Sequence, residues 1–238
     1  MRILITNDDG IGAEQLLPLV RWAKTLGEVT VVAPLYEQSA KSHGIEIHKP
    51  FTVEKVDLEE GVTAYAVDST PADCVRFAVL GLKMEFDLVL SGVNRGYNIG
   101  TDIMYSGTVA AASEAALLGI PSLALSTSFE NYPNATVELP RVMDYIRNEG
   151  LLDVHPTYNI NIPPEPKGVC ITHQGGPYYS DAFPSVGEGL YQAEGLCVHV
   201  NGGDLTLDTD ATISGYISVM PLTIHRTDTV VYDKLTKE

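Results

Sequence analysis

The sequence predicts an α/β protein with a three-layer α/β/α, Rossmann-like core on a mostly parallel sheet, followed by extended β-hairpin elements in the C-terminal part. Two observations predict this fold class. Short apolar runs alternate with segments of helical period over the first 150 residues, a rhythm typical of a doubly wound parallel sheet. After about residue 150 the helical period is lost, and glycine, proline and tyrosine cluster.

The core strands are expected where apolar and β-branched residues run together, at residues 2–6, 29–33, 63–67, 87–91 and 122–126. The segments that follow the first, third and fourth of these strands predict helices at residues 13–26, 70–80 and 106–118. Gly27 and Gly119 are placed to end the first and third helices, and Pro71 stands near the start of the second. Further strands are expected at residues 159–162, 169–172 and 213–219.

We expect a single domain overall. Residues 1–150 would form the α/β core that carries the functional site, and residues 151–238 would supply hairpin and oligomerisation elements packed on it. Extended strands with little helical cover need a surface to pack against. The sequence therefore predicts a homo-oligomer, with a dimer ranked above a tetramer.

Charge and hydropathy exclude several classes of partner. The formal net charge is −16, and no Lys or Arg occurs between Lys167 and Arg226, so a groove for a nucleic-acid polymer is not expected. The longest apolar stretch, residues 109–125, is interrupted by Ser113, Glu114 and Pro121, so no membrane span is expected. The chain begins directly with strand-forming residues and its three cysteines form no CxxC pair, from which we expect a cytoplasmic protein.

Two adjacent aspartates end the first predicted strand, in the segment ITNDDG. Side chains alternate along a strand, so an extended chain would aim Asp8 and Asp9 to opposite faces. Gly10 and Gly12 allow a sharp turn, after which both carboxylates can face one cation. Oxygen ligands suit a hard divalent ion such as Mg²⁺ or Mn²⁺. The alternative is that one aspartate merely caps the following helix.

Neutral oxygen donors follow two other predicted strands. Ser39 lies in the polar loop after the second strand, and Asn94 lies in the glycine-rich segment after the fourth. Because the carboxyl ends of parallel strands meet at one edge of the sheet, both side chains are natural additional ligands for the same ion.

The segment Ser106-Gly107-Thr108 begins the third predicted helix. The N–H groups at a helix N-terminus and the helix dipole favour an anion, and we expect Gly107 to allow a phosphate close to the backbone. A cation beside a helix N-terminus is suited to phosphate-ester chemistry. The alternative is ordinary N-capping by Ser106 or Thr108.

Four segments, ILITNDDG, VVAPLYEQS, TPADCV and SGVNRGYNIGTDIMYSGTVAAASEAALLGIPSLALS, resemble the SurE family of stationary-phase survival proteins. The later segments NINIPP and GYISVMPL resemble the C-terminal portion of that family, so the resemblance extends over nearly the whole chain. Two positions depart from it, since Ala40 and Ser69 stand where many members have glycine.

The resemblance implies a divalent-metal-dependent 5′/3′-nucleotidase that hydrolyses nucleoside monophosphates and, in some members, short polyphosphate. One metal ion per subunit is expected, and the family's metal ligands fall on Asp8, Asp9, Ser39 and Asn94. Its Tyr-Ser-Gly-Thr loop falls on residues 105–108. Members of the family are dimers or tetramers joined partly by exchanged C-terminal elements.

Two alternatives remain open at this stage. Within the enzyme interpretation, Asp8 could attack phosphorus and form an aspartyl-phosphate, in place of direct attack by a water that Asp8 or Asp9 orients or deprotonates. Outside enzymes, the chain could be a non-catalytic nucleotide-binding or sensory module, because a fold alone does not decide function.

Overall fold

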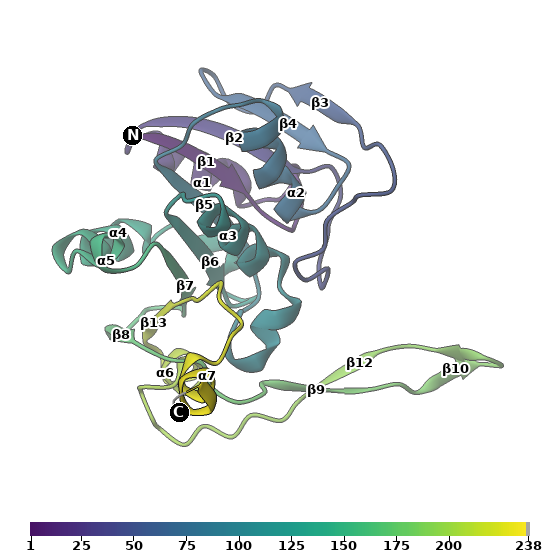
Figure 1. The fold of residues 1–238 in the computed structure, drawn as a ribbon, viewed down its shortest axis with the longest axis vertical. Helices are drawn as coiled ribbons and strands as arrows, with labels where there is room; N and C mark the ends of the chain where they lie inside the picture. Colours follow the sequence, from purple (N-terminus) through teal and green to yellow (C-terminus); the bar gives the residue numbers. More distant parts are fainter. Residues whose placement is uncertain (237–238) are drawn as a thin grey trace.

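One nine-stranded sheet runs through the molecule, with helices on both of its faces (Figure 1). The computed structural model describes residues 1–236. From one edge to the other, the strand order is β3-β4-β2-β1-β5-β6-β7-β13-β8. The strands are β1 Arg2–Thr6, β2 Glu28–Pro34, β3 Val53–Val56, β4 Thr63–Val67, β5 Leu88–Arg95, β6 Ser122–Thr127, β7 Thr157–Ile162, β8 Val169–Ile171 and β13 Ile217–Pro221.

Most of this sheet is parallel, as the sequence predicts. Strands β4, β2, β1, β5, β6 and β7 run in one direction, whereas β3 and β13 pair antiparallel with β4 and β7. From β1 the chain moves to one side to form β2, and it later returns to the other side of β1 to form β5. The order therefore reverses between β1 and β5, and ligands of open α/β sheets bind beyond the carboxyl ends of the strands at such a point.

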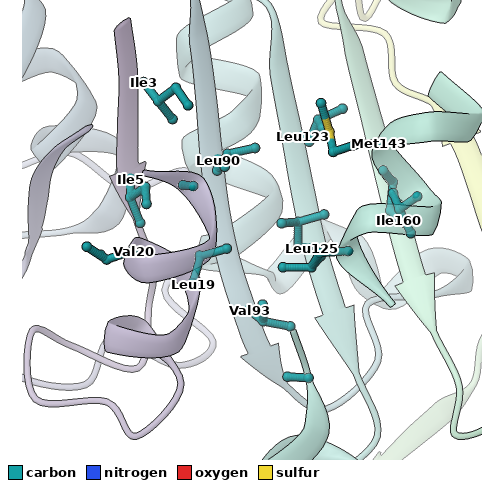
Figure 2. Close-up of a cluster of buried hydrophobic side chains, with 14 of the residues drawn as sticks. Ile3, Ile5, Leu19, Val20, Leu90, Val93, Leu123, Leu125, Met143 and Ile160 are labelled. Atoms are coloured by element: carbon teal, nitrogen blue, oxygen red, sulfur yellow. The ribbon is translucent and has the colours of Figure 1, made fainter. Parts of the chain in front are cut away.

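Alternating side chains on β1 divide the core between the two faces of the sheet. Ile3 and Ile5 pack with α1 and α4 in one buried cluster, part of which Figure 2 shows. Leu4 packs with α2 and α3 in a second cluster on the opposite face. Burial of each of these side chains contributes about 1.5–3 kcal/mol to the stability of the fold. The two clusters on opposite faces of the sheet confirm the predicted three-layer α/β/α core. The helices named here are α1 Leu16–Ala23, α2 Pro71–Arg76, α3 Gly107–Leu117 and α4 Leu139–Asn148.

Two of the predicted helices differ from expectation. α1 is shorter than the predicted range 13–26, because turns precede Leu16 and follow Ala23, and β2 then begins with the Glu28 N–H donating to the Met1 carbonyl at 2.9 Å. The helix predicted at residues 70–80 changes after α2 into a π-helical turn, η1 (Phe77–Gly81). Across residues 1–236, no helix is long and apolar enough to cross a membrane.

The prediction of a strand at residues 213–219 is wrong for the first half of that range. Residues Asp208–Ile213 form α6, Gly215 turns the chain at φ +87°, and β13 begins only at Ile217. The helix is stabilised by its first turn, where Asp210 accepts hydrogen bonds from two preceding backbone N–H groups. The sequence pattern does not predict β3, α4, α5 (Leu151–Val154) or α7 (Thr229–Thr236).

The chain after residue 150 contributes both to the sheet and to a projecting hairpin. Strands β7, β13 and β8 extend the central sheet. Residues 179–197, here called the arm, form an antiparallel hairpin that projects from the body (Figure 1), which confirms the predicted hairpin elements. Its apolar side chains are exposed, among them Phe183 at 64% and Tyr191 at 70%. The arm is built from β9 Tyr179–Ala182, β10 Ser185–Gly187, β11 Leu190–Tyr191 and β12 Glu194–Cys197.

Candidate active site

The turn after β1 places two aspartates at the switch point of the sheet. Asn7 holds this turn closed, because its side chain donates to the Gly10 carbonyl (2.9 Å) and accepts from the Gly10 N–H (3.1 Å). Gly10 has φ +94°, a conformation that favours glycine, whereas Gly12 has no positive φ and no close neighbour. Asp8 and Asp9 therefore leave strand geometry as expected, but through one glycine rather than two.

Asp8 is buried and joins the end of β1 to the start of α3. Its Oδ1 accepts a 2.5 Å hydrogen bond from the hydroxyl of Thr108. Gly107 lies against the same side chain, since a Cβ added at Gly107 would stand 2.9 Å from the Asp8 Cβ and 3.2 Å from its Oδ2. Burial raises the pKa of Asp8, and the hydrogen bonds from Thr108 oppose that rise.

Asp9 lies beside the end of β5, where its Oδ2 accepts from the backbone N–H of Arg95 at 3.3 Å. Burial and, after it, the charge of Asp8 raise the pKa of Asp9 to about 6. In the described chain, neither aspartate forms an ion pair with a basic side chain. The charge of Arg95 lowers the pKa of Asp9, but less than burial and Asp8 raise it. Two adjacent buried acids with no ion-pair partner form a place where a bound cation is stabilising.

Ser39 and Asn94 reach the aspartates through their neighbours in the chain. The N–H of Gln38 donates to the Asp8 carbonyl at 2.7 Å, which holds the loop after β2 against the first aspartate. Arg95, which contacts the second aspartate, directly follows Asn94. Asn94 lies within the end of β5 and not in the loop expected after it, since this strand continues to Arg95. The structure thus brings together the segments that carry all four predicted metal ligands.

The donor atoms of Ser39 and Asn94 are already engaged, which leaves their oxygens for a cation. The Ser39 hydroxyl donates to the Glu37 carboxylate (2.7 Å), and the Asn94 amide donates to the Gly96 carbonyl (2.8 Å). No group of three or more His, Cys, Asp or Glu side chains suited to a metal occurs within residues 1–236. A metal here would rely on two carboxylates and neutral oxygens, a donor set that fits a hard divalent ion.

Glu37 is a third acid at this site, and the sequence analysis missed it. Its negative charge raises the pKa of both Asp8 and Asp9. Its hydrogen bond with the Ser39 hydroxyl also fixes the orientation of that side chain. The signal in the sequence was its position, two residues before a candidate ligand in a polar loop.

The predicted anion site at the start of α3 is built differently from expectation. The Ser106 hydroxyl accepts from the Val109 N–H at 3.1 Å, which is ordinary N-capping, and the Thr108 hydroxyl is bonded to Asp8. The Val109 N–H is bonded to Ser106 and a backbone hydrogen bond from Thr108 reaches Asp8, so the Gly107 N–H and the helix dipole are what this end of α3 offers an anion. A side chain at Gly107 would also collide with Asp8, a second reason for glycine beside the close approach of a phosphate that the sequence predicts.

Comparison with known proteins identifies the family. A family model described as survival protein SurE matches residues 3–181. The chain belongs to the SurE family. A 5′-nucleotidase SurE of Thermosipho melanesiensis is 39% identical over 241 residues, which cover 96% of this chain and 93% of that protein. A second protein of that name, from Desulforudis audaxviator, is 38% identical and covers 100% of this chain and 97% of its own length.

A solved structure agrees with the SurE assignment. The crystal structure of the SurE protein from Aquifex aeolicus superposes with a TM-score of 0.78 at 33% identity, covering 99% of this chain and 98% of that chain. The resemblance to the SurE family and the predicted α/β fold class are both confirmed. The SurE family match spans every candidate site residue and ends within β9 of the arm.

Proposed function

We propose that this protein is a divalent-metal-dependent phosphomonoesterase that hydrolyses nucleoside 5′- and 3′-monophosphates to nucleoside and phosphate, with short-chain polyphosphate as a further substrate. The observation that carries the proposal is the pair Asp8 and Asp9 at the switch point, which forms no ion pair within the described residues and lies against the N-terminus of α3. A cation and a helix N-terminus in one place suit phosphoryl transfer, where stabilising charge is most of the catalysis. The relatives named 5′-nucleotidase support nucleotides as substrates.

Asp8, Asp9, Ser39 and Asn94 would hold one Mg²⁺ or Mn²⁺ ion per subunit. When bound, such an ion supplies positive charge that stabilises negative charge developing on a phosphoryl group. The phosphate would lie between Asn94 and the segment Ser106–Thr108, where the Gly107 N–H and the dipole of α3 would bind its oxygens.

The aspartates offer two routes for the attack on phosphorus. In the route we favour, the carboxylate of Asp9 or Asp8 orients a water and takes its proton. In the alternative route Asp8 is the nucleophile, and it would attack through Oδ2 because Oδ1 is bonded to Thr108. Trapping of radiolabelled phosphate on acid-quenched protein during turnover supports the covalent route, and its absence supports direct attack by water.

Phosphate release from a panel of nucleotides tests the proposed activity. The panel contains 5′- and 3′-monophosphates of each nucleoside, together with a short polyphosphate, each assayed with Mg²⁺, with Mn²⁺ and with a chelator. We expect release that depends on metal and stops with the chelator. Binding of nucleotides without any release of phosphate would instead identify a sensory or nucleotide-binding module.

We also propose that the protein is a cytoplasmic homo-oligomer, with a dimer ranked above a tetramer. Exposed apolar side chains on the arm and on α7 support this proposal, since such surfaces on soluble proteins commonly mark contacts with a partner. Light scattering at micromolar protein concentration should give a mass above that of one chain. A monomer with full activity would contradict the proposal.

A further inference from the structure

A cleft of about 580 Å³ lies between the segment that precedes α3 and the base of the arm. One wall is η2 (Gly100–Tyr105), and the other includes Tyr179 and Asp181 of β9. Tyr105 stands two residues before Gly107, whose backbone lies against Asp8. The wall of the cleft thus leads directly along the chain into the place proposed for the phosphate.

Hydrogen bonds hold the two walls of this cleft together. The Tyr179 N–H donates to Asp102 Oδ2 at 2.9 Å, which fixes the arm to η2. Below the cleft, the buried carboxylate of Asp208 accepts from the N–H of Gly100 (2.8 Å) and from that of Gly175 (2.7 Å). The cleft is thus a feature set by the fold and not a chance gap between two loops.

Two exposed aromatic rings give the cleft a surface for a flat ligand. Tyr105 is 62% exposed and Tyr179 is 45% exposed, although tyrosine normally buries much of its ring. Among the aromatic rings of the described residues, Tyr179 contacts that of Tyr178, edge to face with the ring centroids 4.9 Å apart. Stacking of a nucleobase on such a ring is typically worth about 1–3 kcal/mol.

The charges in the cleft exclude a second phosphate and favour a ligand with amino groups. Its walls carry Asp102 and Asp181 and contain no Lys, Arg or His. Asp102 keeps Oδ1 available after its bond to Tyr179, and within the described residues the Asp181 side chain makes no hydrogen bond. Carboxylates accept hydrogen bonds from the exocyclic amino groups of adenine, cytosine and guanine, which uracil and hypoxanthine lack.

We propose that this cleft is the nucleobase subsite, with a preference for bases that carry an amino group. The base would stack on Tyr105 or Tyr179 and donate to Asp102 or Asp181, while the phosphate lies at the start of α3. The placement of the phosphate rests on the function proposed above. The base subsite itself can be tested without any turnover.

Nucleoside binding is the direct test. Adenosine and inosine, which carry no phosphate, are titrated by NMR or calorimetry into the full-length protein, its Tyr179→Leu and Asp181→Asn variants, and the matched control Tyr191→Leu at the far end of the arm. We expect adenosine to bind more tightly than inosine. Tyr179→Leu should weaken adenosine binding about tenfold, the effect typical of one lost stacking contact. Asp181→Asn should reduce the preference for adenosine over inosine. The control Tyr191→Leu should bind adenosine like the parent.

Turnover separates a failure of the subsite from a failure of the proposed function. The ratio of kcat/KM for AMP to that for ribose 5-phosphate should fall about tenfold in Tyr179→Leu. Adenosine binding that depends on Tyr179, in a protein that releases no phosphate, would refute the phosphatase and retain the subsite. Phosphatase activity without detectable adenosine binding would overturn the proposed subsite. The same holds if adenosine binding and the kcat/KM ratio are unchanged in both Tyr179→Leu and Asp181→Asn.

Discussion

The hydroxyl of Thr108 donates a 2.5 Å hydrogen bond to Oδ1 of Asp8, a residue 100 positions earlier in the chain. Both side chains are buried, and a hydrogen bond to a charged group in such a place is worth about 1.5–3 kcal/mol. The bond leaves Oδ2 of Asp8 for a cation. It makes the orientation of the first aspartate depend on the position of α3.

Thr108→Val should therefore weaken metal binding rather than phosphate binding alone. Valine keeps the shape of threonine but removes the donor, so Asp8 loses the contact that orients it. We expect metal affinity to fall about 10- to 100-fold, as for other residues that hold a metal ligand in place. Calorimetric titration with Mn²⁺ measures this. Thr108→Ser keeps the hydroxyl and should stay near the parent; equal affinities for the two variants would show that the bond does not orient Asp8.

Asp9→Asn should remove metal-dependent activity while the protein stays folded. The amide keeps the size of the side chain and can still accept from the Arg95 N–H, but it lacks the charge that holds a divalent ion. Activity at limiting metal concentration is the measurement, with circular dichroism as the check on folding. Near-normal turnover under these conditions would exclude Asp9 as a metal ligand.

The metal-free protein should gain stability as the pH falls from 7 to 5, in part through Asp9. Its pKa is about 6 in the folded chain against an ordinary value of 3.8. Near pH 5 the folded state therefore binds a proton that the unfolded state still lacks, which favours folding. A pKa shift of this size adds at most about 3 kcal/mol to the free energy of unfolding. Chemical denaturation in chelator should show a smaller gain for Asp9→Asn, and an identical gain would refute the assignment.

Gly107→Ala should disturb the proposed cation site as well as the proposed anion site. The added Cβ would stand 2.9 Å from the Asp8 Cβ and 3.1 Å from Pro71, so the aspartate or the helix must shift. We expect both weaker Mn²⁺ binding and lower kcat. A suitable control is Gly12→Ala, because Gly12 has no atom within 4 Å of an added Cβ. Unchanged metal affinity with weaker vanadate inhibition would instead restore the phosphate-blocking role expected from the sequence.

Ala40→Gly should stabilise the loop that carries Ser39. Ala40 has φ +57°, in the left-handed region where an L side chain costs roughly 1–2 kcal/mol. Glycine removes this cost, and part of the gain is offset by its greater freedom in the unfolded chain. We expect a rise in Tm of about 2–4 °C, as for ~1 kcal/mol in a chain of this size. Ala13→Gly, at a position between two turns and without positive φ, should give no rise, and an equal rise in both variants would contradict the strain argument.

Local features of the sequence were enough to establish the layers of the fold and the residues that end its strands. The apolar run of β1 and the alternation of Ile3, Leu4 and Ile5 determine which side chains enter which face of the sheet. The acids and glycine that follow β1 mark the turn in the same local way. Periodicity over a few residues is enough for such conclusions, because a strand or helix exposes its faces at a fixed spacing.

The tertiary structure alone decided how the polar groups are paired. Thr108 donates to Asp8, Glu37 adds its charge to both aspartates, and Tyr179 is fixed beside Asp102. Each of these relationships joins elements that the packing of helices and strands brings together. The strength of a hydrogen bond or charge interaction depends on distances of a few ångströms and on burial, and spacing along the chain contains neither quantity.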